Sequence, residues 1–481
     1  METMPPTATP ATLPENARRT PPVWLVTLLV CAGQFLVVLD VSVVNVALPS
    51  MRTGLGLSEL GLQWVVNAYV ITFAGFMLLG GRVADLFGRK RIFVVGLTLF
   101  TVASLAGGLA REPWQLIAAR AVQGIGAAVL SPATLTILTT AFPAGPARTR
   151  AIATWTAVGA GGGAVGGLVG GVLTEYLSWR WVLLINVPVG ALVLAGALRW
   201  LTESRRGEGR RLDIPGALLV TAGLALVAYG IVQTESDGWT SATALLPLAA
   251  GLLVLLAFVA VEARTKAPLM PLTLFRLRSV YAANSAMVLA GAAMFSMWYF
   301  LSLYVQNVLG YTPLEAGLSF IPHSLSIVLG SKIAPRLMKR AGAKTLAVTG
   351  ALVSAAGMLW QGQMDADGTY LGTLLGPGIL MAFGAGLTAT PIASIATSGA
   401  APSDQGLVSG LINTSRQMGG ALGLSILSTV AATRIAADHG GRAAMAAGYG
   451  LAFEVGTAVL LASVLLMVLA LPRRPEDAHH D

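Results

Sequence analysis

Residues Gly81–Arg91, GRVADLFGRKR, join two long apolar runs and are much richer in charge than either run. The charged residues are Arg82, Asp85, Arg89, Lys90 and Arg91. Short loops rich in Lys and Arg are retained on the cytoplasmic side of a membrane. Gly81 and Gly88 permit a tight reversal, and Asp85 can accept hydrogen bonds from cations or a helix N-terminus. An ordinary basic loop would share the cations but not this order of glycines, acid and basic cluster. The stretch therefore predicts a specialised cytoplasmic turn between two membrane-spanning helices.

The composition indicates the class of protein. Of the 481 residues, 55% are hydrophobic and only 11% are charged, whereas soluble proteins carry about 25% charged residues. The net charge of +9 would suit a nucleic-acid partner, but the cations lie in short loops between apolar runs and therefore report membrane topology. We expect a lipid bilayer as partner and no nucleic acid.

Cysteine and histidine are too rare to predict a metal centre. Cys31 is the only cysteine, which excludes an internal disulfide and a cysteine metal cluster. Two of the four histidines, His479 and His480, lie in the C-terminal tail. The sequence also lacks a phosphate-binding loop of the form G-x-x-x-x-G-K-[S/T]. We therefore expect no metal and no cofactor, with the proton gradient as the energy source.

Fourteen apolar runs are long enough, at about 20 residues each, to cross a bilayer. An even number of spans places both termini on one side of the membrane. The sequence therefore predicts an all-α integral membrane protein with fourteen transmembrane helices. They lie near 24–48, 62–81, 92–110, 114–142, 151–173, 181–201, 214–233, 243–262, 281–308, 315–334, 345–362, 371–397, 406–432 and 450–471.

The loop charges predict which side holds the termini. If both termini are cytoplasmic, only five of the 31 Lys and Arg residues fall in outer loops, and Arg120 and Arg416 fall within spans. The five are Arg52, Arg111, Arg180, Arg434 and Arg442. All others lie on the cytoplasmic side, so the positive-inside rule predicts an N-in, C-in topology.

An internal repeat divides the chain into two similar halves. Ser331–Arg340, SKIAPRLMKR, is a weaker copy of residues 81–90, with Pro335 in place of Asp85 and Met338 in place of Gly88. It follows the tenth predicted span as the original follows the second, so we expect a loop there too. Two halves with a site between them are the usual plan of a transporter. The predicted organisation is a disordered cytoplasmic tail 1–22, a six-helix bundle 23–201, a linker with two extra transmembrane helices 202–280, a second six-helix bundle 281–471 and a cytoplasmic tail 472–481.

Two charges inside predicted spans indicate a functional site. A charge at bilayer depth costs about 3 kcal/mol or more on insertion scales and is functional by default. Asp40 lies about 12 Å from the outer end of its span at about 1.5 Å per residue, and Arg120 reaches nearly the same depth. Opposite charges at one depth relieve each other's desolvation, and an acid so placed can exchange a proton as its surroundings change. We expect Asp40 and Arg120 to act in proton coupling; a static structural pair is the alternative.

Several motifs resemble those of a known transporter family. Leu39–Pro49, LDVSVVNVALP, is similar to the first-helix signature L-D-x-T-V-V-N-V-A-L-P of fourteen-span drug/proton antiporters. Gly81–Arg91 resembles the loop G-[R/K]-x-x-D-x-x-G-R-[R/K] of the major facilitator superfamily. Arg120–Gly126 resembles the fourth-helix signature R-x-x-Q-G-x-G, whose arginine is implicated in proton coupling. Trp179–Gly190 and Asn413–Gly420 are also similar to this family.

The resemblance implies a major facilitator fold and a function in transport. It implies alternating access between two six-helix bundles, with an amphipathic drug or antibiotic exported in exchange for protons. We also expect a monomer in a cell membrane, and the Ala-, Gly- and Arg-rich composition suits a bacterium. The cytoplasmic latch would be formed by Gly81, Arg82, Asp85, Gly88, Arg89 and Lys90.

One glycine-rich run departs from the family pattern. Exporters of this superfamily usually carry G-P-x-x-G-G in the fifth span, and here Gly167 stands in place of the proline. The neighbouring Gly166, Gly170 and Gly171 still allow close helix packing. Loss of the proline removes a kink determinant and weakens the inference of export. Proton-coupled uptake of a small organic solute is therefore the alternative function.

Polar and aromatic residues within the spans predict a substrate cavity. An apolar cavity with aromatic and few polar groups suits bulky amphipathic or cationic molecules. Arg416 is unpaired by sequence, so we expect a partner or an anionic ligand group beside it. The alternative is packing or lipid contact for each aromatic, and a packed neutral side chain for His323. The candidates are Gln34, Asn45, Asn67, Tyr69, Gln123, Trp155, Trp298, Tyr299, Tyr304, Gln306, His323, Asn413 and Arg416.

Two other classes of function are disfavoured. An intramembrane enzyme would need a convergent set of acids, bases or metal ligands, and the sequence has no such cluster. A receptor without transport is disfavoured because no loop is long enough for a soluble signalling domain.

Overall fold

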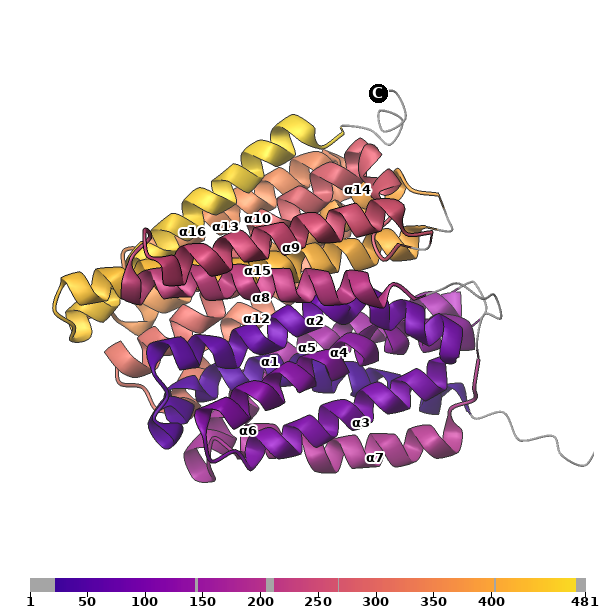
Figure 1. Ribbon diagram of the computed structural model, residues 1–481, viewed down its shortest axis with the longest axis horizontal. Helices are drawn as coiled ribbons and strands as arrows, with labels where there is room; N and C mark the ends of the chain where they lie inside the picture. The colour runs from indigo at the N-terminus through magenta and orange to yellow at the C-terminus, as the bar shows by residue number, and fades with distance from the viewer. Residues whose placement is uncertain (1–21, 143–145, 205–211, 267, 402–403, 473–481) are drawn as a thin grey trace, which may run out of the picture.

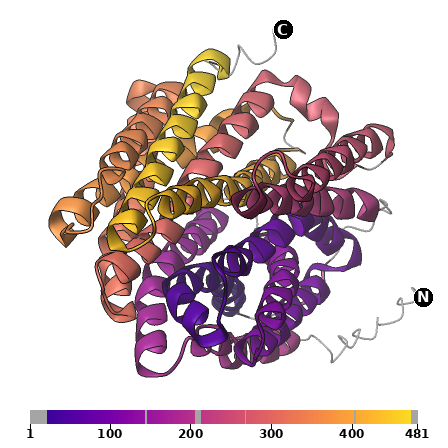
Figure 2. The same ribbon diagram turned by 60° about the vertical axis from the view of Figure 1, so that its left-hand side comes forward.

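The computed structural model describes residues 22–142, 146–204, 212–266, 268–401 and 404–472, and the regular elements within these ranges are all helices. The helices form two bundles that lie side by side, with one helical pair beside them (Figure 1, Figure 2). The predicted tails 1–22 and 472–481 lie almost wholly outside the described residues.

The first bundle is built by close contacts between long helices. Both α2 and α3 pack along α4, and α1 packs along α5. A Cβ atom at Gly80 of α2 would lie only 2.3 Å from the Ala128 carbonyl oxygen of α4, so small residues allow this approach. The bundle contains α1 (Val23–Leu55), α2 (Glu59–Phe87), α3 (Arg89–Gly108), α4 (Pro113–Ala141), α5 (Pro146–Tyr176), α6 (Trp181–Leu184) and α7 (Asn186–Trp200).

The second bundle is less regular than the first. Two of its helices contain a π-helical turn, where one extra residue per turn locally widens the helix. After the 3₁₀ turn η1 (Leu272–Arg276), the bundle contains α10 (Arg278–Leu303), η2 (Tyr304–Val308), α11 (Pro313–Ser319), α12 (Ile321–Ala341), α13 (Ala343–Gln361), η3 (Tyr370–Leu375), α14 (Gly376–Ser398), α15 (Gln405–Ala437) and α16 (Arg442–Ala470). The turn η2 continues α10, and η3 leads into α14.

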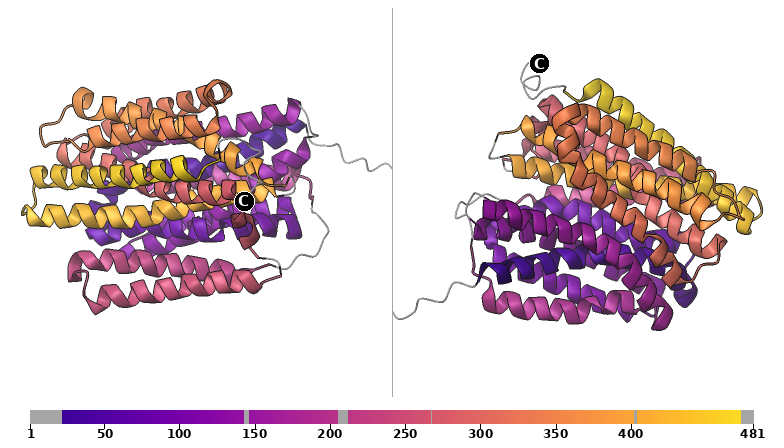
Figure 3. Two further views of the ribbon diagram at one scale, coloured as in Figure 1. Left: turned by 90° about the horizontal axis from the view of Figure 1, so that it is seen from above. Right: turned by 180° about the vertical axis from the view of Figure 1, so that it is seen from behind.

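Helices α8 (Ile214–Asp237) and α9 (Ala242–Arg264) form a pair at the side of the molecule (Figure 3, left). They pack along each other, and α8 also contacts α2 and α15, so the pair touches both bundles. Exposed leucines cover α9, including Leu246, Leu252, Leu253 and Leu256. An apolar face that the protein leaves uncovered suits contact with lipid.

Thirteen helices of the described residues are long and apolar enough to cross a membrane. The predicted span 315–334 is not among them; it is divided at Phe320 into α11 and α12. Pro322 has no N–H group to donate to the preceding turn, which accounts for the break. Helix α12 also carries Lys332, Arg336, Lys339 and Arg340.

The predicted turn at residues 81–91 is much shorter than the motif. Helix α2 continues through Gly81 to Phe87 and α3 begins at Arg89. Gly88, with a φ of 104°, makes the reversal. The expectation that Gly81 takes part in the turn is therefore wrong, because α2 stays helical where Gly81 packs over Pro132 of α4. The side chain of Asp85 lies outside the described part of the chain.

The repeated motif is also helical where a loop was expected. Ser331–Arg340 lies within α12, and the reversal before α13 occurs at Gly342, with a φ of 81°. The correspondence of Met338 with Gly88 is therefore wrong. The equivalent of Gly88 is Gly342, four residues later, because a residue of positive φ ends each helix.

Glu203 binds the start of α3 and was not identified from the sequence. Its carboxylate oxygens accept hydrogen bonds from the backbone N–H groups of Lys90 at 3.1 Å and Arg91 at 3.0 Å. The Arg89 N–H donates to the Ser204 carbonyl at 3.0 Å. A carboxylate at a helix N-terminus satisfies free N–H groups and opposes the positive end of the helix dipole. The segment after α7 is therefore fastened to the α2–α3 turn.

We expect Gly88→Ala to lower the melting temperature of the purified protein more than Gly342→Ala. Both changes place a side chain in a backbone conformation that costs about 1–3 kcal/mol. A Cβ at Gly88 would also lie 2.5 Å from the Glu203 carboxyl carbon, whereas a Cβ at Gly342 meets nothing within 4 Å. Melting curves in detergent measure the difference, and equal losses would contradict a role for the Glu203 contact.

Candidate functional site

Asp40 and Arg120 meet in the interior of the first bundle. Arg120 Nη1 of α4 donates to Asp40 Oδ2 of α1 at 2.6 Å, and the two side chains are 2% and 0% exposed. Asp40 lies near the middle of the 33-residue α1, which continues past Pro49 to Leu55, beyond the predicted end of the span at 48.

Neutral donors complete the surroundings of the Asp40 carboxylate. Its Oδ1 atom accepts from Gln123 Nε2 at 2.6 Å and from Asn186 Nδ2 of α7 at 3.0 Å. Both amides also donate to Ser104 Oγ of α3, at 2.8 Å and 3.3 Å. The network joins four helices of one bundle. Asn186 and Ser104 were not predicted for it, because residues on different helices give no common spacing in the sequence.

Arg120 is held on its other sides as well. Its Nε donates to the Val65 carbonyl of α2 at 3.1 Å, and its guanidinium carbon lies 4.3 Å from the centre of the Tyr69 ring. The charge of Arg120 is thus balanced by Asp40 and supported by a carbonyl and an aromatic face. The described surroundings of Arg120 therefore contain one opposite charge, Asp40, within the first bundle.

The two bundles are joined at one end, which we call the contact end; it holds the α1–α2 and α15–α16 connections, at the left of Figure 1. Pro49 in α1 has no N–H group, so the Asn45 carbonyl lacks its usual helical donor. Ser302 Oγ of α10 supplies a hydrogen bond to that carbonyl at 2.6 Å. Gln306 Nε2 donates to the next carbonyl, of Val46, at 2.9 Å. The interruption of α1 therefore creates a docking point for the second bundle.

The glycine-rich run of α5 has two packing faces at the contact end. A Cβ at Gly166 or Gly170 would lie 2.5 Å or 2.9 Å from the nearest atom of α1, within the same bundle. Gly171 faces α11 of the second bundle, where a Cβ would lie 2.6 Å from the nearest atom. A Cβ at Gly317 of α11 would lie 2.2 Å from the Gly167 carbonyl. The glycine that stands where the family pattern has proline thus lies directly against the other bundle.

Further polar contacts cross between the bundles. Glu175 Oε2, near the end of α5, accepts from the Leu314 N–H at 2.9 Å. Deeper in the protein, Asn67 Nδ2 of α2 donates to Ser425 Oγ of α15 at 3.0 Å. At the opposite end, which we call the basic end because it holds the α2–α3 and α12–α13 turns, the bundles incline away from each other (Figure 1, Figure 3, right).

The predicted cavity residues do not form one site. Five of them are at most 1% exposed and cannot contact a ligand in this conformation, so their assignment to a cavity lining is wrong here. Most are held inside the protein by a hydrogen bond or a cation, as Tyr304 is through its hydroxyl, which donates to the Asp365 carbonyl at 2.7 Å. The five are Asn67, Tyr69, Gln123, Tyr304 and His323.

Two predicted residues of the first bundle lie together. Ser131 Oγ donates to Gln34 Oε1 at 3.1 Å, and Trp155 Nε1 donates to Thr134 Oγ1 at 3.0 Å. Thr134 Oγ1 also lies 3.5 Å from Gln34 Oε1. Gln34, Trp155 and Thr134 are therefore parts of one polar cluster on α1, α4 and α5.

The predicted residues of the second bundle form two groups. Trp298 of α10 packs edge-on against Phe320 and His323, with ring centres 5.6 Å and 6.3 Å away. Arg416 Nη2 of α15 donates to Asn413 Oδ1 at 2.9 Å. Within the described ranges, no three His, Cys, Asp or Glu side chains stand close enough to hold a metal ion.

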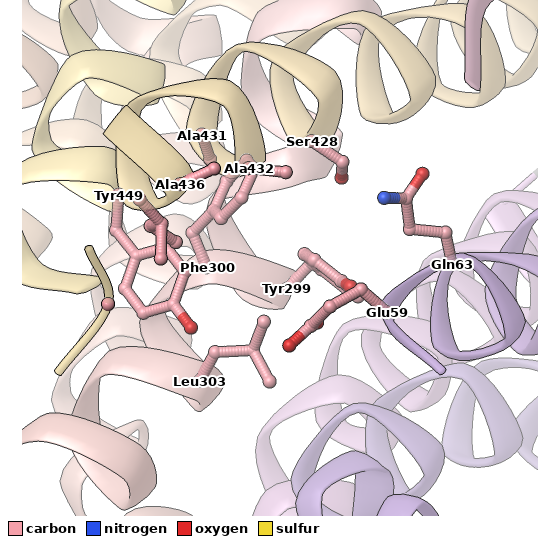
Figure 4. A pocket seen from close by; sticks show the side chains of 12 residues that line it. Glu59, Gln63, Tyr299, Phe300, Leu303, Ser428, Ala431, Ala432, Ala436 and Tyr449 are labelled. Atoms are coloured by element: carbon pink, nitrogen blue, oxygen red, sulfur yellow. The ribbon is translucent and has the colours of Figure 1, made fainter. Parts of the chain in front are cut away.

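A cavity of about 250 Å³ lies at the contact end between α2 of the first bundle and α10, α15 and α16 of the second. Figure 4 shows Glu59 and Gln63 facing the aromatic side chains of Tyr299 and Tyr449 across this space. Of the residues predicted for a cavity, Tyr299 lines it. The other lining residues are Phe300, Leu303, Ser428, Ala431, Ala432, Ile435, Ala436 and Gly440.

Comparison with known proteins identifies relatives over nearly the whole chain. The sequence profile of the Major Facilitator Superfamily matches residues 30–424. A cephamycin export protein of Amycolatopsis lactamdurans is 50% identical over 448 residues, which cover 92% of this chain and 91% of that protein. A puromycin resistance protein of Streptomyces alboniger is 41% identical over 466 residues, which cover 95% of this chain and 92% of that protein.

Solved structures show the same fold at low sequence identity. The chain is similar to a D-xylose-proton symporter, with a TM-score of 0.64 at 15% identity, over 94% of this chain and 98% of the other. A peptide transporter of the POT family gives a TM-score of 0.69 at 15% identity, over 92% of this chain and 96% of the other.

Proposed function

Because this chain belongs to the major facilitator superfamily, we propose that it exports an amphipathic drug or antibiotic in exchange for protons, by alternating access of one central site. Two relatives are named for cephamycin export and for puromycin resistance, which supports an antibiotic as cargo and export as the direction. The relatives are bacterial transporters rather than enzymes, and the thirteen apolar helices make this a multi-pass membrane protein.

The proposed topology has fourteen spans with both termini in the cytoplasm. Helices α11 and α12 together form the tenth span, and the cations of α12 gather toward its C-terminal end. The basic end then faces the cytoplasm, because Arg82, Lys90, Lys339 and Arg340 lie at or near its turns. The contact end faces outward.

The observation that carries proton coupling is the buried Asp40–Arg120 pair. A carboxylate at 0% exposure, held by Arg120, Gln123 and Asn186, binds a proton only if the surrounding helices move. That requirement links the protonation of Asp40 to the change between outward-facing and inward-facing states. The cycle needs no bound cofactor, and one chain contains both bundles.

The contacts between the bundles support an inward-facing state. Hydrogen bonds to the Asn45 and Val46 carbonyls and the approach of Gly317 to Gly167 close the contact end. The bundles incline apart toward the basic end (Figure 1). In the opposite state, the α2–α3 turn at Gly88 latches the cytoplasmic side, and Glu203 holds that turn in place.

Everted membrane vesicles test the proposed function. Vesicles from cells that express the protein are energised by respiration and supplied with radiolabelled puromycin or a radiolabelled cephamycin. We expect uptake into the vesicles above that of vesicles without the protein, and loss of this uptake when an uncoupler collapses the proton gradient. Uptake that persists with the uncoupler would contradict proton coupling. Uptake into intact cells, without uptake into everted vesicles, would favour the alternative of solute import.

A further inference from the structure

Arg416 carries a charge within an apolar span without an acidic partner among the described residues. It stands eleven residues after Gln405, the first residue of α15, which is about 16 Å along the helix axis. Its hydrogen bond goes to the neutral side chain of Asn413 at 2.9 Å. Other arginines of the described residues do have acidic partners, among them Arg52, Arg120 and Arg434.

The face of α15 that carries Arg416 is located by the helices on either side of it. The Arg416 side chain has exposed surface. Ser409, Asn413 and Arg416 recur at intervals of four and three residues and therefore share one face of α15. Gly410 of α15 contacts α2 of the first bundle, and Gly419 contacts α10 of the second. The face that carries Arg416 lies between these two contacts, so it looks into the space between the bundles.

At the same level the first bundle offers polar groups, and its buried acid Asp40 already has partners among the described residues. Gln34 also stands eleven residues after the first residue of its helix, in the cluster with Thr134 and Trp155. On α5, a Cβ at Gly159 would meet only the Gln34 side chain, at 4.0 Å, so there is room beside this cluster. Asp40 is already bound by Arg120, Gln123 and Asn186.

We infer that Arg416 binds an oxyanion of the cargo, so that the preferred substrates are amphipathic acids rather than amphipathic cations. The inference rests on the proposed export function and names the substrate class of its site. The planar guanidinium matches a carboxylate with two parallel hydrogen bonds. The aromatic face of Trp155 and the amide of Gln34 provide the apolar and neutral polar contacts for the rest of the molecule.

A set of three probes with one aromatic body tests this inference. Radiolabelled naproxen is an acid, its methyl ester is neutral, and its 2-aminoethyl amide is a cation. Equilibrium binding of each is measured on the purified full-length protein by scintillation proximity, for wild type, Arg416→Lys and Arg416→Gln. Arg434→Gln is the matched control, because Arg434 lies on the same helix but pairs with Asp438 at 3.2 Å near its far end.

We expect the wild type to prefer the acid. Arg416→Gln should weaken binding of the acid by about tenfold to a hundredfold, the value of a hydrogen bond to a charged group, and leave the ester nearly unchanged. Arg416→Lys should lose less, because it retains the charge but not the planar fork. Arg434→Gln should bind all three probes as wild type does.

Three results would overturn the inference. The first is a wild type that binds the ester or the amine more tightly than the acid. The second is an affinity of Arg416→Gln for the acid that equals that of the wild type. The third is an equal loss of affinity for all three probes in an Arg416 variant whose melting temperature is that of the wild type. If Arg416→Gln does not fold, Arg416→Lys tests the inference instead. Lysine keeps the positive charge, so a Lys variant that no longer prefers the acid would contradict a role for that charge. The binding assay needs no proton gradient, so it is independent of the vesicle assay. If the acid binds through Arg416 but vesicles accumulate no cargo, the proposed export function is rejected and the proposed binding site is retained.

Discussion

Asp40→Asn is expected to abolish proton-driven accumulation in everted vesicles, with a fall of about a hundredfold or more, as for the loss of a group that transfers protons. The amide has nearly the shape of the carboxyl group but cannot exchange a proton at neutral pH. The same change leaves Arg120 buried at 2% exposure without its counter-charge. Removing one partner of a buried ion pair costs about 3–5 kcal/mol, so we also expect a lower melting temperature.

A double variant separates the coupling role of Asp40 from its structural role. Asp40→Asn with Arg120→Gln removes both charges and should recover much of the lost stability, but not the proton-driven uptake. Exchange of labelled for unlabelled cargo without a gradient should persist in this variant, because exchange needs no net proton movement. Uptake by Asp40→Asn that stays fast and sensitive to an uncoupler would show that another group carries the proton. A static structural pair would be restored in full by the double variant.

Gly317→Leu is expected to hold the contact end open and to reduce transport by about tenfold or more, since a state needed for the cycle becomes inaccessible. A Cβ at this position would already lie 2.2 Å from the Gly167 carbonyl, which is backbone and cannot turn aside. Helices α5 and α11 must therefore separate. Spin labels on cysteines at the exposed positions Tyr176 and Leu318, in a Cys31→Ser background, report this separation as a longer distance.

Gly161→Leu is the matched control for this experiment. It places the same side chain on α5 where a Cβ meets nothing within 4 Å. The distance between the labels should then remain as in the wild type. A normal label distance and normal transport in Gly317→Leu would contradict the view that this glycine contact is part of the gate.

The spans could be predicted from the sequence because hydropathy and charge act locally along the chain. Runs of apolar residues interrupted by basic turns predict membrane helices wherever they occur. A charged side chain without a partner is costly to place inside a membrane. The pairing of Asp40 with Arg120 could therefore be predicted, because the two opposite charges lie at similar depth. The predicted tenth span is not among the thirteen apolar helices, because two prolines and four cations within α12 lower its mean hydropathy.

The lining of the cavity could not be predicted, because the spans are apolar on most of their faces. A polar residue in such a helix can face a cavity, a neighbouring helix or the opposite bundle, and hydropathy does not distinguish these directions. Asn67 therefore seemed equivalent to Gln34, yet Asn67 is buried against Ser425 whereas Gln34 is only partly buried. The rotation of each helix about its axis is decided by packing against other helices.

The sequence alone determined that this is a helical membrane transporter with a buried acid and arginine, because composition, charge placement and short motifs are properties of the chain itself. Only the tertiary structure decided what holds the two bundles together. Pro49 leaves a carbonyl that Ser302 binds, and Gly167 lies against Gly317. These partners are far apart in the sequence, and their contact depends on how whole helices cross. Arg416 is such a case too, because the sequence left open a protein partner or an anionic ligand group, and the described residues place no acid beside it.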